Sequence, residues 1–297
     1  NEKNLYLTWK IDKKCLERKL MAKKNQSIRL TSQHKKSKGT IGIFGEEAKS
    51  HDMAINTVSK LVKKELENKY PELEFRYRGN ITKEEINIAL RKLDIELGQT
   101  LFVSNAKIIP DGGLIEVKDD NGKWRVILVS EAKHQGKDIE NIKVGKLVGS
   151  KNNQDLMVAG NAIERSHKNI SEISNFMLSE LHFPYVIFLE GSNFLTENIS
   201  IERPDGRIVV LNYDSGALNR LDRLSSANYG MPFNTNLCVN KFIKHKDRTI
   251  MLQAASIYTT GNGSRWKPEE IFDIMLEISE TSLQMLGRDI FKQITKK

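Results

Sequence analysis

Two acidic residues and one lysine are spaced so that they could support metal-assisted chemistry on a phosphate group. Asp111 lies in a Gly-rich turn, PDGG (110–113), while Glu131 and Lys133 end the apolar stretch WRVILVSEAK (124–133). Side chains two residues apart in a strand point to the same side, so Glu131 and Lys133 share a face and Ala132 is turned away. Charged side chains at the end of an apolar strand are poor choices for packing, which makes this stretch a candidate site.

The chemistry that these residues suit is hydrolysis of a phosphodiester bond. Two carboxylates at one edge form an oxygen-rich site of the kind that Mg²⁺ prefers, with water completing its coordination. The carbonyl group of Ala132 can add a ligand, and Lys133 can hold a phosphate oxygen or a hydroxide. The metal would polarise the phosphorus and acidify a water molecule, and the lysine would stabilise the growing negative charge. The spacing alone favours a plainer alternative, a turn aspartate and a surface ion pair.

A second Pro-Asp-Gly sequence shows how little that tripeptide means without its partner residues. It occurs at 204–206, in RPDGRIVVLNY. No Glu-x-Lys ends a strand at a comparable distance after it. We therefore expect Asp205 to be an ordinary turn residue.

The elements around the first motif predict an α/β fold with a mixed central sheet flanked by helices. Asn121-Gly122, between two β-rich runs (114–117 and 124–129), indicates a hairpin with a primed turn. Thr82, followed by Glu85 three residues later, is a capping box that begins a helix within 80–92. Apolar periodicity predicts further helices at 44–70, 167–181 and 268–294. Strands are expected at 183–191, 209–211 and 251–258.

Composition limits the class of protein. The chain has 297 residues, of which 39% are hydrophobic and 29% charged, and it has no apolar run long enough to span a membrane. Its two cysteines cannot form a disulfide framework or a zinc cluster and fit the reducing cytoplasm. The net charge of +9 and pI of about 9.3 are typical of a protein with a polyanionic partner, although a merely basic protein has the same balance.

The N-terminal region is expected to lie outside the folded domain. Residues 1–20 are expected to be an extension, because Met21 offers an alternative start. Residues 21–39 contain six Lys and Arg residues and no acidic residue, and they have no periodic apolar face. This stretch is expected to be a mobile basic arm, either a solvated tail or an arm that grips phosphate.

Longer segments add a family resemblance. PDGG followed by EAKHQGKD fits the PD-(D/E)xK nuclease pattern, and the residues of these two segments resemble those of the EcoRI family of restriction endonucleases. The resemblance extends through RLTSQHKKSKGTIGIFG, GNAIERSHKNISEI, NFMLSE, HFPYV, FLEGSNFLTENISI, NRLDRL, ANYGMP and MLQAASIYT. It covers nearly all of residues 21–297. Agreement over such a length is far more specific than the short motif. It outweighs the alternative of a turn aspartate and a surface ion pair.

The resemblance implies an activity, a cofactor and partners. Members of this family are homodimeric, Mg²⁺-dependent endonucleases that cut duplex DNA at the palindrome GAATTC and leave 5′ AATT overhangs. By this resemblance, residues 40–297 form a single nuclease domain of the restriction-endonuclease-like fold, with insertions that wrap DNA. A cognate DNA methyltransferase is expected in the host, without direct contact.

The resemblance also assigns site residues. Asp111, Glu131 and Lys133 match the catalytic positions, with Asp111, Glu131 and Ala132 as the metal ligands. The positions that match DNA-reading residues, or that follow the catalytic strand closely enough to contact DNA, are Met157, Val158, Ala159, Gly160, Asn161, Ala162, Glu164, Arg165, Arg220, Arg223, Gln135 and Lys137.

The chemistry of the DNA-reading residues agrees with that assignment. The amide of Asn161 can make a bidentate contact to adenine, and the residue is also suited to cap a helix. Arg165 can contact a purine, and Glu164 is better suited to holding the arginines in place. Without the resemblance, residues 157–162 read as an ordinary loop before a helix. Arg220 and Arg223, one helical turn apart, either face DNA or cap a surface helix.

One position departs from the family pattern. Val158 stands where the family has alanine, so it adds two methyl groups beside Met157 in the segment expected to read bases. We therefore expect more relaxed discrimination at the outer base pairs, with GAATTC still preferred.

A non-catalytic, sequence-specific DNA-binding protein on a nuclease-derived fold is the alternative function. The intact trio of Asp111, Glu131 and Lys133 argues against it. Two carboxylates beside phosphate repel DNA unless a metal neutralises them, so a protein that only binds DNA has no use for them.

Overall fold

The computed structural model describes residues 40–99, 105–146, 160–180, 182–213, 241–245, 248–252 and 255–287. For 40–54, 160–165, 241–245 and 248–252 the description is of the backbone alone. The chain divides into two compact units, Asn1–Lys49 and Ser50–Lys297. All elements below lie in the second unit, except the first ten residues of the helix α2.

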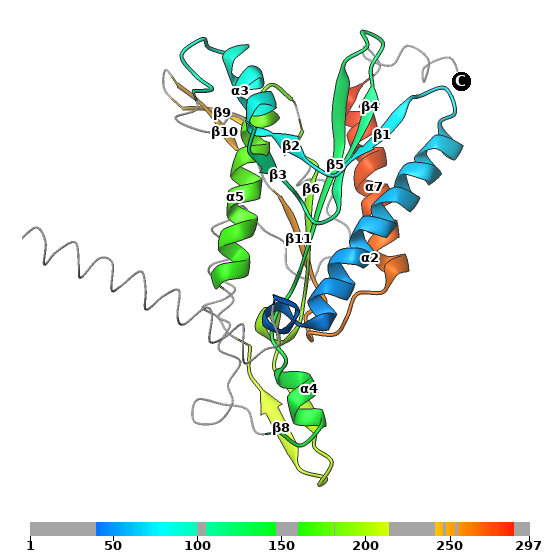
Figure 1. Ribbon diagram of the computed structural model, residues 1–297, viewed down its shortest axis with the longest axis vertical. Coiled ribbons are helices and arrows are strands. Elements are labelled where there is room, and N and C mark those ends of the chain that lie inside the picture. Colours follow the sequence, from blue (N-terminus) through cyan, green and yellow to red (C-terminus); the bar gives the residue numbers. More distant parts are fainter. Residues whose placement is uncertain are drawn as a thin grey trace, which may run out of the picture. The chain divides into compact units, whose positions relative to one another are not determined.

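A five-stranded sheet forms the centre of the second unit (Figure 1). Its strands are β1 (Phe75–Arg78), β4 (Gly113–Lys118), β5 (Trp124–His134), β6 (Tyr185–Glu190) and β11 (Ser256–Thr259), in that spatial order. β1, β4 and β5 pair antiparallel, whereas β5, β6 and β11 are parallel. The sheet is therefore mixed, and the predicted α/β class is confirmed.

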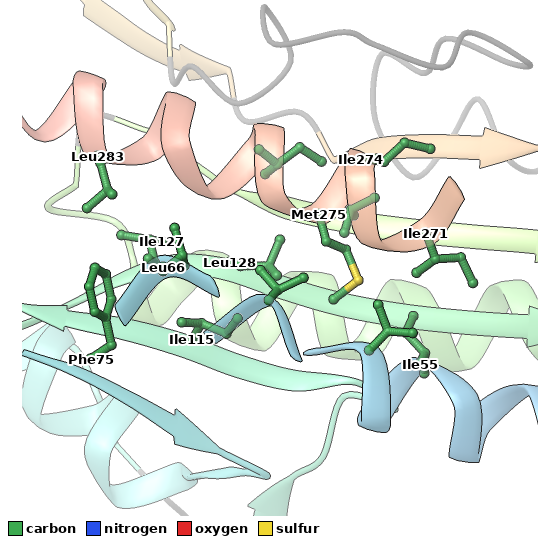
Figure 2. Packing of buried hydrophobic residues seen from close by; sticks show 14 of the residues in the cluster. Ile55, Leu66, Phe75, Ile115, Ile127, Leu128, Ile271, Ile274, Met275 and Leu283 are labelled. Atoms are coloured by element: carbon green, nitrogen blue, oxygen red, sulfur yellow. The ribbon is translucent and has the colours of Figure 1, made fainter. Parts of the chain in front are cut away.

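Two helices cover one face of this sheet, namely α7 (Pro268–Leu286) and the part of α2 (Thr40–Lys69) that belongs to the second unit. Figure 2 shows apolar side chains of α7 meeting those of α2, β4 and β5. The buried cluster includes Ile55, Val62, Leu66, Phe75, Ile115, Ile127, Leu128, Ala132, Ile274, Met275 and Leu283. Burial of each of these side chains except that of Ala132 contributes about 1.5–3 kcal/mol relative to exposure, so this layer holds β5 firmly in place.

The opposite face is covered by α3 (Lys83–Arg91) and α5 (Gly160–Phe176). Ile86, Leu114, Val126, Val129, Ile170, Ile173, Met177, Tyr185 and Ile187 belong to the buried cluster there. An ion pair of 2.6 Å between Lys83 Nζ and Glu172 Oε2 joins the two helices. α5 is thus fixed on the face of the sheet to which Val129 points.

Shorter elements complete the described part of the chain. β2 (Ile81–Thr82) pairs with β3 (Lys107–Ile108), β7 (Ile199–Glu202) with β8 (Ile208–Leu211), and β9 (Lys241–His245) with β10 (Arg248–Leu252). α4 (Asp138–Lys143) and the 3-10 turn η1 (Ser192–Phe194) follow β5 and β6. No helix among these described residues is long and apolar enough to cross a lipid bilayer.

Most predicted elements are present, with three differences. The capping box at Thr82 and Glu85 is confirmed. The β4–β5 hairpin is also present, but Asp119 N–H donates to Lys123 C=O across the turn and Gly122 N–H donates to Asp119 C=O, so residues 120–122 form a three-residue connection rather than a two-residue primed turn. The expected strand at 251–258 is two separate strands, β10 and β11, in different sheets. The last expected helix ends at Leu286, before Gly287, and residues 288–297 lie outside the described part.

Candidate active site

The end of β5 and the turn before β4 bring Asp111 beside the Glu-x-Lys sequence. Gly113 is paired with Ser130, and Gly112 N–H donates to Ser130 C=O at 2.9 Å. Asp111 is therefore level with the next residues of β5, and its Oδ2 lies 3.4 Å from Ala132 N. The hairpin thus places a turn carboxylate at the end of the strand that carries Glu131 and Lys133.

The two glycines of this turn are required by close packing and by backbone geometry. A Cβ atom at Gly112 would lie 2.1 Å from Ser130 Oγ, and Gly113 has a positive φ of 72° with Arg78 C=O only 2.6 Å from such a Cβ. Glycine permits both the contact and the left-handed conformation. The Gly-rich sequence therefore seats the Asp111 turn against the sheet.

Lys133 bridges the two carboxylates. Its Nζ donates to Asp111 Oδ2 and lies 2.7 Å from Glu131 Oε1. The side chain of Glu131 is fully buried, whereas those of Lys133 and Asp111 are 16% and 24% exposed. The predicted trio is thus brought together in one cluster that opens towards solvent on the Asp111 side.

Burial and charge act in opposite directions on this cluster. Burial raises the pKa of Glu131, and nearby Asp111 raises it further, while the Lys133 ammonium opposes both effects. For Lys133, burial by itself would lower the pKa, but the two carboxylates outweigh burial and raise it. The lysine is therefore held in its charged form beside the carboxylates.

Two further donors contact Glu131, and neither was predicted from the sequence. The hydroxyl of Tyr185 donates to Oε2, and Asn169 Nδ2 donates to Oε1 at 3.3 Å. Tyr185 is the first residue of β6 and Asn169 lies in α5. Sequence reasoning read Tyr185 as part of an apolar buried strand and Asn169 as part of a helix, and no local pattern connects either residue to Glu131.

The residues present fit a hard divalent cation. Mg²⁺ is commonly bound by one or two carboxylates together with water and substrate phosphates. Ala132 N–H points towards Asp111, and the N–H and C=O groups of one strand residue point to the same neighbour, so its carbonyl group also faces the Asp111 turn. Among the described residues no group of three or more His, Cys, Asp or Glu side chains could hold a metal. Asp111, Glu131 and the Ala132 carbonyl therefore form a small donor set, which leaves room for water and phosphate ligands.

The residues that follow Lys133 have differing environments. His134 Nδ1 lies 2.9 Å from Glu190 Oε1, and both side chains are buried, which fits a structural role for the histidine. The Gln135 side chain is buried, and its backbone N–H donates to Glu190 C=O at 3.0 Å. Lys137 is half-buried and precedes α4. Gln135 is thus enclosed by protein rather than presented to a ligand.

The segment expected to read bases is described only in part. α5 begins at Gly160, so Asn161, Ala162, Glu164 and Arg165 lie in its first two turns, and Asn161 is inside the helix rather than at its N-cap. Met157, Val158, Ala159, Arg220 and Arg223 lie outside the described residues. The helix that carries the described part of this segment also carries Asn169, and thus connects it physically to the carboxylate cluster.

The second Pro-Asp-Gly sequence behaves as predicted. Asp205 lies in the turn between β7 and β8 and pairs with Arg207 at 2.6 Å. Both side chains are largely exposed, at 46% and 76%. The same tripeptide therefore forms a plain turn where no Glu-x-Lys strand adjoins it.

Comparison with known proteins agrees with this geometry. The sequence profile of a family described as "Restriction endonuclease EcoRI" matches residues 37–293. The type II restriction enzyme EcoRI of Escherichia coli is 69% identical over 277 residues, which cover 93% of this chain and 100% of that protein. The type II restriction enzyme RsrI of Cereibacter sphaeroides is 46% identical over 267 residues, or 90% of this chain and 96% of that protein.

Proposed function

Because the chain belongs to the EcoRI family of type II restriction endonucleases, we propose that it cuts duplex DNA at GAATTC, with Mg²⁺ as its cofactor, and leaves 5′ AATT overhangs. The chain is a site-specific DNA endonuclease, which sets aside the alternative of a non-catalytic binding protein. The observation that carries the proposed chemistry is the contact of one lysine ammonium with the carboxylates of Asp111 and Glu131.

Each residue of the cluster has a role in this proposal. Asp111, Glu131 and the carbonyl group of Ala132 would hold Mg²⁺, which when bound supplies Lewis acidity to the scissile phosphate and to the attacking water. Lys133, held in its charged form, donates to a phosphate oxygen and stabilises the negative charge that develops during attack. The turn at 110–113 and strand β5 keep these groups in place before DNA arrives, which lowers the cost of organising them.

Base reading is assigned to the beginning of α5 and the residues before it. Asn161 contacts adenine, Arg165 contacts a purine, and Met157, Ala159, Gly160 and Ala162 lie against thymine methyl groups and pyrimidine edges. Glu164 positions the arginines. Gln135, Lys137, Arg220 and Arg223 complete the DNA-contacting set. Gln135 is buried here, so its contact with a base requires rearrangement on DNA binding.

Asn161→Ala is expected to reduce sequence discrimination. Loss of a bidentate amide contact to adenine removes roughly 1–3 kcal/mol per half-site. The measurement is the ratio of affinities for a GAATTC duplex and for a duplex with a changed central pair, at one salt concentration. Removing the arm residues Arg29, Lys35 and Lys36 provides the contrast, because loss of phosphate contacts should weaken all sequences alike and flatten the salt dependence. Equal weakening of both duplexes by Asn161→Ala would assign that residue a purely structural role.

Val158 is expected to relax discrimination at the outer G·C pairs. Its β-branched side chain is stiff at χ1 and adds bulk beside Met157. The expected loss is at most about 1–3 kcal/mol, the usual scale for one mismatched pair, with GAATTC still preferred. A competition digest of GAATTC against variants changed in the outer pairs, run with the natural chain and with Val158→Ala, measures this. An unchanged ratio would mean that Val158 has no part in specificity.

The proposed target also leads to proposals about the oligomeric state of the protein, its companion enzyme and its localisation. A two-fold symmetric site is read by a two-fold symmetric protein, so the chain is proposed to act as a homodimer on DNA. Protection of host DNA requires a cognate methyltransferase that modifies the same sequence. The endonuclease and the methyltransferase are both proposed to act on DNA in the cytoplasm, where the two cysteines of this chain remain reduced.

A direct test uses one duplex with a single GAATTC and a matched duplex with that hexamer scrambled. The expected result is cleavage of the first duplex in the presence of Mg²⁺, none in EDTA, and none of the scrambled duplex. Equal cleavage of both duplexes would contradict the proposed specificity, and cleavage in EDTA would contradict the proposed cofactor.

A further inference from the structure

The carboxylate of Glu131 is held by donors from three different directions. Tyr185 donates to Oε2, whereas Asn169 Nδ2 and Lys133 Nζ contact Oε1 at 3.3 and 2.7 Å. Lys133 Nζ also contacts Asp111 Oδ2. Oε1 is therefore the oxygen that faces Asp111, and Oε2 is the oxygen that faces Tyr185.

Tyr185 is itself rigidly placed. It is fully buried, its backbone is paired with Val129 of β5, and its ring stacks on Phe183 at 5.7 Å between centroids. A buried phenol hydroxyl needs a hydrogen-bond partner, and Glu131 provides it. Because the ring is fixed by packing, the hydroxyl fixes one carboxylate oxygen in turn.

Asn169 acts on the other oxygen from a different element. It is half-buried and lies on α5, whose Ile170 and Ile173 pack into the core beneath the sheet. The contact of 3.3 Å is longer than the usual N–H···O bond, so it is a weak hydrogen bond. Together the two donors contact both carboxylate oxygens of Glu131, which restricts the orientation of that side chain.

We propose that Tyr185 and Asn169 are positioning residues, which hold Glu131 so that Oε1 is directed towards Asp111 for a divalent cation and Oε2 is retained by the phenol. This inference rests on the proposed function, in which Glu131 holds the metal. Groups that hydrogen-bond metal ligands fix the orientation of those ligands, and their loss typically lowers metal affinity or activity by roughly 10–100-fold.

The test is calorimetric titration of Ca²⁺, another cation that prefers oxygen ligands, into the full-length protein bound to a GAATTC duplex. Tyr185→Phe keeps the ring in the core and removes only the hydroxyl. The expected result is Ca²⁺ affinity lower by roughly 10–100-fold and a matching rise in the Mg²⁺ concentration for half-maximal cleavage. DNA affinity without metal should stay within about two-fold, because no DNA-contacting group changes.

Tyr70→Phe is the matched control, since it also removes a tyrosine hydroxyl that donates to a glutamate, here Glu280 at 3.5 Å. Neither residue belongs to the candidate site, so Ca²⁺ affinity and cleavage should be unchanged. Thermal melts of both variants separate a loss of metal affinity from a loss of fold.

Asn169→Ala tests the same inference independently. It also keeps the inference testable if Tyr185→Phe does not fold. Its expected effect is a smaller, several-fold loss of Ca²⁺ affinity. Ca²⁺ affinity equal to that of the natural chain in a folded Tyr185→Phe protein, or in Asn169→Ala, would overturn the inference. A natural chain that neither binds Ca²⁺ nor cuts DNA with Mg²⁺ would instead overturn the proposed function.

Discussion

Asp111→Asn is expected to abolish cleavage of duplex DNA while leaving sequence-specific binding intact. The substitution keeps the size and the turn conformation but removes the charge that faces Lys133 and Glu131. Mg²⁺ is held by carboxylates, and a neutral amide is a much weaker ligand. With one negative charge fewer beside the phosphates, binding in the absence of divalent metal should be equal or tighter. Gel-shift and cleavage assays on one purified variant measure both effects.

The chain offers its own control for this substitution. Asp205→Asn makes the same change in the other Pro-Asp-Gly turn, where the carboxylate is exposed and pairs with the nearby Arg207. Exposed ion pairs contribute little to stability, so Asp205→Asn should neither unfold the protein nor remove its catalytic step. Normal cutting by Asp111→Asn would falsify the assignment of this residue to the metal.

Lys133→Ala is expected to slow cleavage by roughly 10²–10³-fold, because a contact that stabilises developing charge contributes about 2.7–4 kcal/mol to lowering the barrier. The raised pKa of Lys133 supports this role, since the side chain carries its charge throughout the neutral range. The appropriate measurement is the single-turnover rate at saturating enzyme, which excludes differences in DNA affinity.

Loss of fold must be separated from loss of catalysis in Lys133→Ala. Removing one partner of a buried ion pair typically costs about 3–5 kcal/mol of stability, and Glu131 is fully buried. A thermal melt and a gel shift therefore accompany the kinetic assay. Lys118→Ala, which removes an exposed lysine paired with Glu74 at 2.9 Å, serves as control and should cut normally. A single-turnover rate for folded Lys133→Ala within a few-fold of the natural chain would exclude the lysine from the chemical step.

The sequence could predict that Asp111, Glu131 and Lys133 lie together, because their geometry is local. Glu131 and Lys133 share a face through the two-residue period of a strand, and the hairpin before them needs only a turn to return Asp111 to the same edge. The structure brings these three residues together as expected. Asn169 and Tyr185 were missed because they reach Glu131 from 38 and 54 residues away, through packing that no local pattern encodes.

Secondary structure and burial were predicted less accurately where tertiary contacts determine them. Apolar periodicity correctly indicated α2 and α7, whose stripes face the sheet. The range 251–258 was expected to form one strand, yet it includes parts of two strands that pair with different neighbours. The position of Gln135 was also beyond the reach of sequence, because its burial depends on the packing of the segment after β6.

The central claim is Mg²⁺-dependent cleavage at GAATTC by the Asp111, Glu131 and Lys133 cluster. The most direct measurement is a digest of plasmid DNA by the natural chain with Mg²⁺, followed by sequencing of all the ends produced. We predict that the ends map to GAATTC sites and carry 5′ AATT overhangs, and that the Asp111→Asn digest contains none of them. Ends at unrelated sequences, or the same ends from Asp111→Asn, would contradict the account.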